Sequence, residues 1–391
     1  MKAMGKRHMT IARTFAASLL FGAPLFAPGF AAAAEKRVET EKVAVIVETL
    51  AEGLEHPWAV EALPDGAYLV TERPGRMRIV KDSKLSDPIG GVPDVRARGQ
   101  GGLMDVAVAP DFATSRTIYF TASTANRKGS GTKAFSARLA ADGSRLENVK
   151  TIFTMKKFTG GNIQYGSRIA IASDGTLFIS IGDRGDPDRS QDWKDDAGSI
   201  VHINADGSIP ADNPFKDSAK ALPEIWSKGH RNPQGITFDI ADGKLYTVEH
   251  GARGGDEINV IEPGKNYGWP IISYGRNYSG SKIGEGTAKK GLEQPLHYWD
   301  PSIAPGALAI YRGNMFPEWD GNFLVAALKF ELLSRMQRNK NGTLVAAEQI
   351  FEGDYGRLRD VVVAPDGALL IVTDEDDGAL LRVSRSDRQN G

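Results

Sequence analysis

Four basic side chains stand in polar or glycine-rich segments that border predicted β-strands in separate parts of the chain: Arg231, Lys329, Arg357 and Arg359. If the fold brings these segments together, the cations converge without acid partners. Like charges held close together are costly unless an anion neutralises them. The set therefore predicts a site for a multiply anionic, planar ligand. For any one of them, a solvated arginine or lysine in a surface ion pair is the alternative, because such pairs are common and weak.

The segment from Glu249 to Glu257 combines carboxylates with glycines that expose backbone carbonyls. Hard oxygen ligands of these two kinds suit Ca²⁺. The spacing does not match an EF-hand loop, and no His/Cys cluster in the sequence fits a structural zinc site. The segment thus predicts a calcium site, with an acidic β-turn as the alternative, since Asp and Gly are common in turns.

The elements that must position these residues form a repeat. Each unit is a short β-rich run, a turn around Asp-Gly or Pro-Asp, and a second β-rich run, over residues 59–70, 105–122, 168–181, 235–249, 307–327 and 360–373. Asp-Gly between β-rich runs is a strong hairpin signal, because both turn residues tolerate positive φ. Six such units with hardly any helical periodicity predict an all-β, six-bladed β-propeller. A two-sheet sandwich with long insertions is the alternative.

A ring of blades must close, because a blade cannot bury both of its faces alone. Residues 43–50 form an extra β-rich run near the start of the predicted mature chain. We expect this N-terminal strand to complete the sheet that contains residues 379–383. Loops from every blade then surround a central channel, where we expect the functional site.

Residues 1–34 are predicted to be a Sec-type signal peptide, which leaves 35–391 as the propeller domain. A head with four Lys and Arg residues and no acid precedes a short apolar stretch and a run of alanines. A retained membrane anchor is the alternative, but glycines and prolines interrupt the apolar stretch. We therefore expect a soluble, periplasmic protein with no membrane span in the mature chain. The near balance of 48 basic and 49 acidic residues argues against nucleic acid as a partner, and the absence of cysteine excludes disulfides.

The polar loop motifs resemble those of the soluble glucose/sorbosone dehydrogenases, and in particular the bacterial aldose sugar dehydrogenases that use pyrroloquinoline quinone (PQQ). The resemblance runs from about His56 to Val383. Its most specific pieces are Gln100-Gly101-Gly102-Leu103, Arg231-Asn232-Pro233-Gln234-Gly235, Gly254-Gly255-Asp256-Glu257-Ile258-Asn259 and Gly264-Lys265-Asn266-Tyr267-Gly268-Trp269-Pro270.

This resemblance implies a quinoprotein that oxidises aldose sugars at C1 to lactones, with PQQ and Ca²⁺ as cofactors. The side chains expected to hold PQQ are Gln100, Arg231, Asn232, Gln234, Tyr278, Lys329, Arg357 and Arg359. Backbone oxygens of Gly251 and Ala252 match those that bind the cofactor-bridging calcium, although the family usually has proline at the second position. Glu257 and Tyr267 match the ligands of a further calcium site.

One departure from the family concerns the catalytic base. The family has histidine in a Gly-x-His-Phe-Gly-x-Arg context, and Gln164 stands at that place here. Glutamine cannot accept a proton at ordinary pH. Asp183 is the expected substitute base, because the matching carboxylate sits beside the base in the family. His230 is a second candidate, with a structural role as its alternative.

Other functions stay open at this point. A calcium-dependent lactonase or other hydrolase would need an open water position on the metal, but would leave the convergent cations without a purpose. A non-catalytic propeller that binds PQQ, a sugar or another macromolecule is the other alternative. For the enzyme, a small sugar is the expected substrate; the electron acceptor is unknown, and the chain is expected to be a monomer or homodimer.

Overall fold

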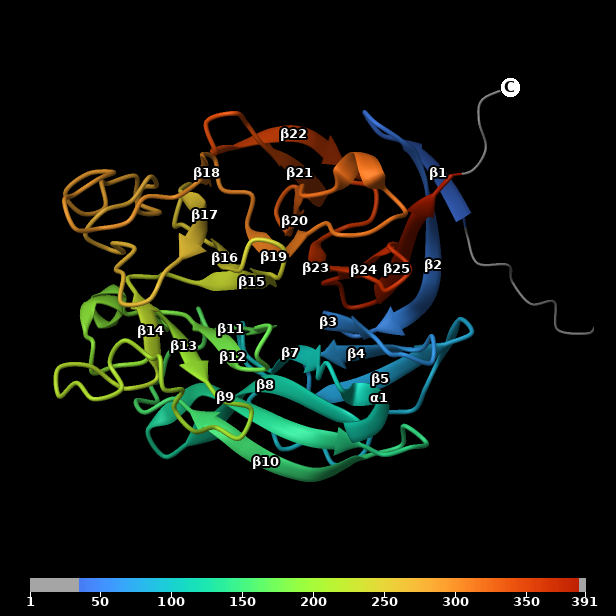
Figure 1. Cartoon of the computed structure of the whole chain (residues 1–391), viewed down its shortest axis with the longest axis horizontal. Coiled ribbons are helices and arrows are strands. Elements are labelled where there is room, and N and C mark those ends of the chain that lie inside the picture. Colours follow the sequence, from blue (N-terminus) through green and yellow to red (C-terminus); the bar gives the residue numbers. More distant parts are fainter. Residues whose placement is uncertain (1–34, 387–391) are drawn as a thin grey trace, which may run out of the picture. The chain divides into compact units, whose positions relative to one another are not determined.

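The computed structural model describes residues 35–386, and the predicted signal peptide lies outside them. Six sheets form a ring around a central axis, five with four strands and one with five (Figure 1). Consecutive hairpins build five of the blades and the three inner strands of the sixth, and every neighbouring pair of strands is antiparallel. The predicted all-β six-bladed propeller is therefore confirmed.

The innermost strands line the axis, and each packs against the innermost strand of both neighbouring blades. They are β3 (Pro57–Ala62), β7 (Leu103–Val108), β11 (Gly166–Ile171), β15 (Pro233–Asp239), β19 (Pro305–Ile310) and β23 (Leu358–Val363) of blades 1 to 6. The second strands are β4 (Tyr68–Glu72), β8 (Thr117–Asn126), β12 (Leu177–Ile181), β16 (Lys244–Glu249), β20 (Phe323–Ala327) and β24 (Leu369–Thr373). All six predicted hairpins are therefore present.

The third and outer strands complete the blades. The third strands are β5 (Arg76–Lys81), β9 (Gly129–Leu139), β13 (Ser199–Ile203), β17 (Asp256–Ile261), β21 (Leu332–Arg338) and β25 (Gly378–Arg385). The outer strands are β6 (Lys84–Leu85), β10 (Leu146–Thr154), β14 (Ile225–Lys228), β18 (His297–Trp299), β22 (Leu344–Ile350) and, in blade 6, β2 (Ala44–Leu54) with β1 (Glu35–Glu39). Short helical turns occur at α1 (Phe112–Ser115), η1 (Pro187–Gln191) and η2 (Pro317–Trp319).

Burial follows position in the blade. The second strands β12, β20 and β24 are buried at every residue, because neighbouring blades cover both of their faces. The outer strands β10 and β22 have many exposed residues. Six large hydrophobic clusters occupy the six interfaces between adjacent blades, including the interface between blades 6 and 1. Interblade packing is therefore the main source of cohesion, as expected without disulfides.

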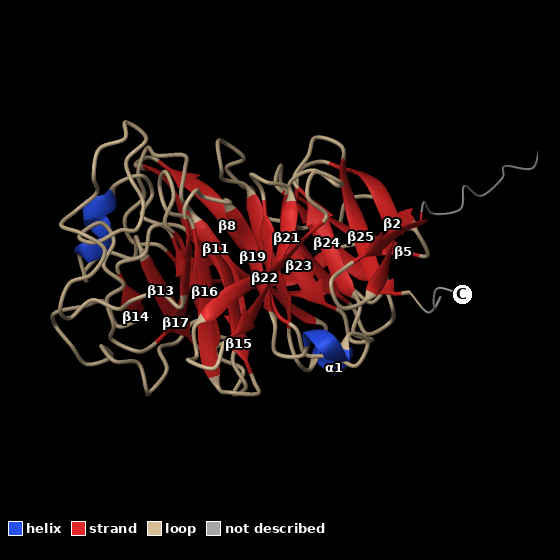
Figure 2. Cartoon of the chain, turned by 90° about the horizontal axis from the view of Figure 1, so that it is seen from above, coloured by secondary structure: helices blue, strands red, loops and turns tan. Residues whose placement is uncertain are grey.

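The ring closes through the first long strand. Strand β2 pairs with β25 in an antiparallel register that places Val47 opposite Val383 and Thr49 opposite Leu381. The predicted closure by an N-terminal strand is confirmed. The strands cross the thickness of the ring, and the loops lie at its two faces (Figure 2). Within residues 35–386, no helix has the length and apolar character needed to cross a bilayer.

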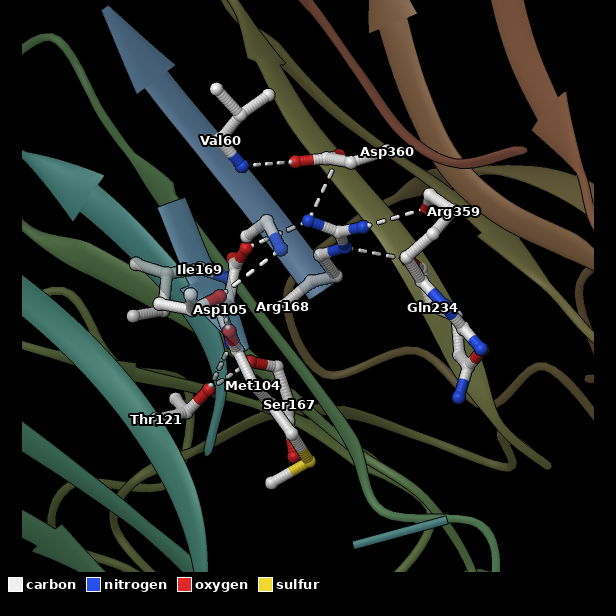
Figure 3. A network of polar contacts seen from close by, with 12 residues as sticks. Val60, Met104, Asp105, Thr121, Ser167, Arg168, Ile169, Gln234, Arg359 and Asp360 are labelled. Atoms are coloured by element: carbon white, nitrogen blue, oxygen red, sulfur yellow. Dashed lines mark hydrogen bonds and ion pairs between the residues drawn. The ribbon is translucent and has the colours of Figure 1, made fainter. Parts of the chain in front are cut away.

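Arg168 of blade 3 contacts the other five blades, and Figure 3 shows its contacts with Asp105, Gln234, Arg359 and Asp360. Arg168 of β11 donates to carbonyls of blades 4, 5 and 6 and pairs with carboxylates of blades 2 and 6, while its guanidinium lies 4.2 Å from the centre of a tryptophan ring of blade 1. The partners are Gln234 O, Gly306 O, Arg359 O, Asp105, Asp360 and Trp58. This hub fixes the six innermost strands relative to one another.

The hub borders a cavity of about 280 Å³ that all six innermost strands line. Its charged residues are Glu61, Asp105, Arg168 and Asp360, so acids outnumber bases there. Burial, with the neighbouring charges of Asp360, raises the pKa of Asp105 to about 6. We call this region the acidic end of the channel.

Candidate active site at the mouth of the channel

The predicted site residues cluster where innermost strands begin and second strands end. Arg231 precedes β15 and Arg357 precedes β23, whereas Asp183 follows β12 and Lys329 follows β20. Because neighbouring strands in a blade are antiparallel, these ends lie on the same face of the ring. The repeat therefore delivers polar side chains from several blades to one end of the channel, which we call the site end.

Three cavities adjoin one another at the site end. One of about 450 Å³ is lined by Gln164, Asp183, Arg231, Ala252 and Tyr278, together with other residues. A second of about 780 Å³ shares Ala252 and Tyr278 with it and extends to Lys329. A third, much smaller cavity lies beside Arg231 and contains two further predicted residues, Glu257 and Tyr267. The predicted catalytic and calcium-binding residues thus line these neighbouring cavities, as do Arg231, Tyr278 and Lys329. The other predicted PQQ-binding residues do not line them: Gln100, Asn232, Gln234, Arg357 and Arg359.

His250 directly follows β16, and the pKa of its imidazole depends on the charges at this end of the channel. Burial, together with the nearby guanidinium groups of Arg231, Arg359 and Arg357, lowers its pKa to about 3. Three cationic side chains from blades 4 and 6 therefore act on one imidazole. The predicted convergence of Arg231, Arg357 and Arg359 on the axis agrees with this effect.

The prediction that these cations lack acid partners is wrong for Arg359. Its guanidinium forms an ion pair with Asp374, which follows β24, and donates to the side-chain oxygen of Gln234 at 2.8 Å. Asp374 keeps a pKa of about 2 despite its burial, chiefly because of Arg359. In the described part of the chain, no ion pair involves Arg231, Lys329 or Arg357. Three of the four cations thus keep charge that a ligand can neutralise.

Two predicted amide side chains support the backbone on either side of Tyr165. The side-chain oxygen of Gln100 accepts the amide hydrogen of Gln164 at 2.7 Å, and that of Asn232 accepts the amide hydrogen of Gly166 at 3.1 Å. Because both oxygens act as acceptors, the NH₂ groups of Gln100 and Asn232 are left as donors. Donors of this kind suit an anionic or quinone-bearing ligand.

Gln164 itself is held in an unusual position. Its φ of 55° lies in the left-handed region, and only 6% of the residue is exposed. Its side-chain oxygen is buried and finds no hydrogen-bond partner within residues 35–386. A buried acceptor without a donor is costly, so this oxygen is suited to accept a hydrogen bond from a bound hydroxyl group. Gln164 Oε1 faces Gly185, since a Cβ at that glycine would lie 3.6 Å from it.

Asp183 lines the same cavity as Gln164 and is completely buried. Its Oδ1 accepts the amide hydrogen of Gly185 at 2.8 Å, and its Oδ2 accepts the indole hydrogen of Trp269 at 2.8 Å. Burial raises the pKa of Asp183, although these hydrogen bonds and Arg231 oppose the shift. A buried carboxylate with a raised pKa that borders a cavity can act as a general base near neutral pH.

His230 has a structural environment, as its alternative interpretation predicted. The imidazole is completely buried, lies 2.9 Å from both Glu249 Oε1 and Ser227 Oγ, and stacks on Tyr267. It is not among the residues that line the three cavities. Both of its nitrogens are engaged, so it is poorly placed to take a proton from a substrate.

The predicted metal ligands fit a cation, although they do not form a site made only of side chains. No group of three or more acid or histidine side chains within the described residues has metal-binding geometry. The Gly251 carbonyl instead accepts a hydrogen bond from the Arg231 guanidinium, so this oxygen is directed at a cation. Ala252 borders both larger cavities. A calcium ion here would need backbone carbonyls, which Ca²⁺ accepts readily.

The second predicted calcium site contains an uncompensated acid. Burial, together with the negative charge of Glu249, raises the pKa of Glu257 to about 8. The side-chain nitrogen of Asn259 lies 3.3 Å from both carboxylates. The Tyr267 hydroxyl donates to the Val260 carbonyl, which leaves the backbone oxygen of Tyr267 as its available ligand. A divalent cation would relieve the repulsion between the two carboxylates.

Two residues beside the site escaped the sequence analysis. Arg184 donates to the carbonyls of Gly161 and Ile163 and stacks 3.4 Å from the centre of the Tyr165 ring, so it fixes the loop that carries Gln164. Trp269 was quoted within a motif but given no role. A tryptophan within a polar loop motif is itself a signal, because a buried indole N–H usually needs a hydrogen-bond acceptor.

Comparisons with known proteins agree with this geometry. The family model described as glucose/sorbosone dehydrogenase matches residues 54–382. The aldose sugar dehydrogenase YliI of Escherichia coli (strain K12) is 43% identical over 347 residues, which cover 87% of this chain and 93% of that protein. Quinoprotein glucose dehydrogenase B of Acinetobacter calcoaceticus is 27% identical over 84% of this chain and 86% of its own length.

A solved structure gives a similar result. The PQQ-bound aldose sugar dehydrogenase of Streptomyces coelicolor superposes with a TM-score of 0.70 at 29% identity, covering 87% of this chain and 98% of that one. The family match spans most of the described residues, and the relatives match nearly end to end. This chain therefore belongs to the glucose/sorbosone dehydrogenase family.

Proposed function

We propose that this chain is an exported, periplasmic oxidoreductase that oxidises aldose sugars at C1 to lactones, with PQQ and Ca²⁺ as cofactors. The observation that carries the proposal is geometric: Arg231 and Lys329, which form no ion pair within residues 35–386, border adjoining cavities, and the buried carboxylate of Asp183 borders one of them. A cationic pocket needs an anionic guest, and PQQ carries several carboxylates. The PQQ-bound relative from Streptomyces coelicolor supports that choice of guest.

The residues at the site end divide into three groups. Arg231, Lys329 and Arg357 would neutralise the carboxylates of PQQ, while Arg359 and Gln234, which bond each other, would form its floor with the amides of Gln100 and Asn232. Tyr278, which is 74% exposed, offers an aromatic face from the loop above. Gly251 and Ala252 would bind one calcium ion through backbone oxygens, and Glu257 and Tyr267 would bind another.

In this mechanism the sugar C1 hydroxyl loses its proton to Asp183 while hydride leaves C1. When bound, PQQ supplies the hydride acceptor and Ca²⁺ supplies a Lewis acid for the quinone oxygens. Gln164 Oε1, which lacks a protein donor, would accept a hydrogen bond from a sugar hydroxyl and so orient it. Gln164 occupies the position where the family has its basic histidine, and Asp183, which lines the same cavity, would act as the base instead.

Gln164 also gives a specific reason to weigh a second candidate, a propeller that binds PQQ but turns over sugar very slowly. Loss of a positioned general base typically lowers a rate by about 10²–10⁴-fold. Whether Asp183 compensates decides between the two candidates. Both share the same cofactor site and differ only in turnover.

The decisive experiment adds PQQ and Ca²⁺, singly and together, to purified cofactor-free protein. The visible spectrum, the melting temperature and aldose-dependent dye reduction are recorded for each mixture. Binding that needs both additions, with dye reduction, supports the dehydrogenase, and binding without dye reduction supports the second candidate. Arg357→Met should weaken PQQ binding, whereas Arg138→Met, in a partly exposed ion pair between β9 and β10, should not. Lactone hydrolysis without PQQ would overturn both candidates.

A further inference from the structure

Trp269 joins the two chemical halves of the candidate site. Its indole nitrogen donates to Asp183 Oδ2 at 2.8 Å, and its ring lies under the Arg231 guanidinium, 5.4 Å from ring centre to Cζ. The residue borders the 450 Å³ cavity together with both partners. One side chain therefore contacts both the expected proton acceptor and one of the expected cofactor cations.

Hydrogen bonds to its backbone fix the position of Trp269. The Trp269 carbonyl accepts hydrogen bonds from Ser190 Oγ and Gln191 Nε2, both at 2.6 Å, and its amide donates to the Gly229 carbonyl at 2.9 Å. Only 9% of the residue is exposed. Because the backbone is fixed by η1 on one side and by the segment before Arg231 on the other, the indole has little freedom to move away from Asp183.

The two acceptor bonds of Asp183 define the orientation of its carboxylate. The Gly185 amide occupies Oδ1 and the Trp269 indole occupies Oδ2. The backbone bond alone leaves the carboxylate free to rotate about its Cβ–Cγ bond, whereas a second donor fixes the plane. Misplacement of a reacting group by about 1 Å can lower a rate by about 10²-fold.

We infer that Trp269 is a positioning residue that orients the Asp183 carboxylate toward the reacting hydroxyl and holds Arg231 in register with it. The inference rests on the proposed function for its kinetic part. The hydrogen bond between Trp269 and Asp183 can be tested without any cofactor.

The charged surroundings of Asp183 set the expected pH behaviour. Arg231 and Arg184 favour its ionised form and Asp186 disfavours it, while Lys282 and Tyr278 line the same cavity. The indole N–H also favours the ionised form, because it donates to the carboxylate. Removal of this donor should therefore raise the pKa of Asp183 further.

The kinetic test compares Trp269→Phe with Trp319→Phe. Trp319 is a suitable control because it is completely buried between blades 5 and 6 and its indole nitrogen has no hydrogen-bond partner in the described chain. Both changes remove the same atoms from a buried ring. Trp269→Phe should lower kcat by about 10- to 100-fold and move the acidic limb of the kcat profile upward by about one pH unit. Trp319→Phe should leave the position of that limb unchanged.

A spectroscopic test uses the wild-type, cofactor-free protein and remains available if Trp269→Phe does not fold. The chain has six tryptophans, so ¹⁵N-indole labelling gives a simple spectrum. The Trp269 signal should titrate with Asp183 and should not titrate in Asp183→Asn. An identical Trp269 signal in wild type and Asp183→Asn at every pH would overturn the inference, as would identical kinetics for the two tryptophan variants. Failure of wild type to oxidise sugar with PQQ and Ca²⁺ would instead overturn the proposed function.

Discussion

The two ends of the axial channel are built from the same six innermost strands but treat charge in opposite ways. At the acidic end, the Arg168 charge is matched by Asp105 and Asp360 at 2.7 and 2.9 Å. At the site end, Arg231, Lys329 and Arg357 have no ion pair in the part of the chain that the structure describes. Buried cations that are paired with carboxylates belong to the fold itself. Cations without an ion pair are suited to a ligand of the opposite charge.

The difference follows from position along the strands. Arg168 and its acid partners lie within the strands, where every neighbour is fixed by the sheet. The cations without ion pairs, Arg231, Lys329 and Arg357, lie in the connections just outside the strands, where side chains can face a cavity. We therefore expect substitutions at the acidic end to change stability and those at the site end to change chemistry.

The largest expected effect is at the site end. Asp183→Asn should lower sugar-dependent dye reduction by about 10²–10⁴-fold, because an amide cannot accept the proton. Steady-state assays with PQQ and Ca²⁺ measure the loss. Asp188→Asn, an exposed carboxylate in η1, is the control and should have little effect. Full activity of Asp183→Asn would exclude Asp183 as the base.

At the acidic end, Arg168→Met should lower the free energy of unfolding by about 3–5 kcal/mol, since it leaves Asp105 and Asp360 buried without their cationic partner. Urea unfolding of the cofactor-free protein at pH 7 measures this loss. The loss should be smaller at pH 5, because protonation of Asp105, whose pKa is already about 6, removes the uncompensated charge. If Arg168→Met proved as stable as Arg138→Met, the two ends would not differ in role.

Calcium should stabilise the site end by about 2.7 kcal/mol at a concentration about 100-fold above its Kd. Without the ion, the raised pKa of Glu257 means that its protonated form stabilises the fold below pH 4.5. That contribution is lost as the pH rises through about 8. Calcium binds the ionised carboxylate, so the rise in melting temperature should be larger at pH 8 than at pH 5.

The control for this measurement is Glu257→Gln. The variant should respond less to calcium and should lose less stability between pH 5 and pH 8 in the presence of a chelator. An equal calcium response in Glu257→Gln and wild type would place the ion elsewhere.

The smallest expected effect is a gain. Gln164→His should raise sugar-dependent dye reduction at least about tenfold, the low side of the range for a positioned general base. Gln337→His, on β21 far from this loop in the sequence, is the control. An unchanged rate would mean that Asp183 already supplies all of the base function, which would sharpen its assignment.

Local signals were sufficient to predict the fold. Each Asp-Gly turn is decided by residues adjacent in sequence, and Gly175 and Gly367 indeed have φ values of 84° and 89°. Ring closure by 43–50 followed from one extra strand that needed a partner. The second unit differs in detail, because α1 occupies its connection where a tight turn was predicted.

The sequence was sufficient to name many residues of the site, but not to predict which of them contact one another. The motifs named the cations, but the partner of Arg359 is Asp374, which lies at the end of the next strand and carries no signal of its own. The roles of Trp269 and Arg184 depend on contacts with residues that lie 86 and 21 to 23 positions away in the sequence. Contacts of this kind arise from the packing of loops between blades, which spacing along the chain does not reveal.

The reach of Arg168 has a consequence for how this ring could change its size. Its single guanidinium serves acceptors from blades 2, 4, 5 and 6 and stacks on a ring of blade 1, all within hydrogen-bonding or contact distance. Insertion of a seventh blade would widen the axis and carry some of these acceptors out of range, and deletion of one would crowd them. Repeat proteins change size by duplicating or losing a repeat. In this chain such a change would break contacts of Arg168, so we expect it to require a substitution at Arg168 as well.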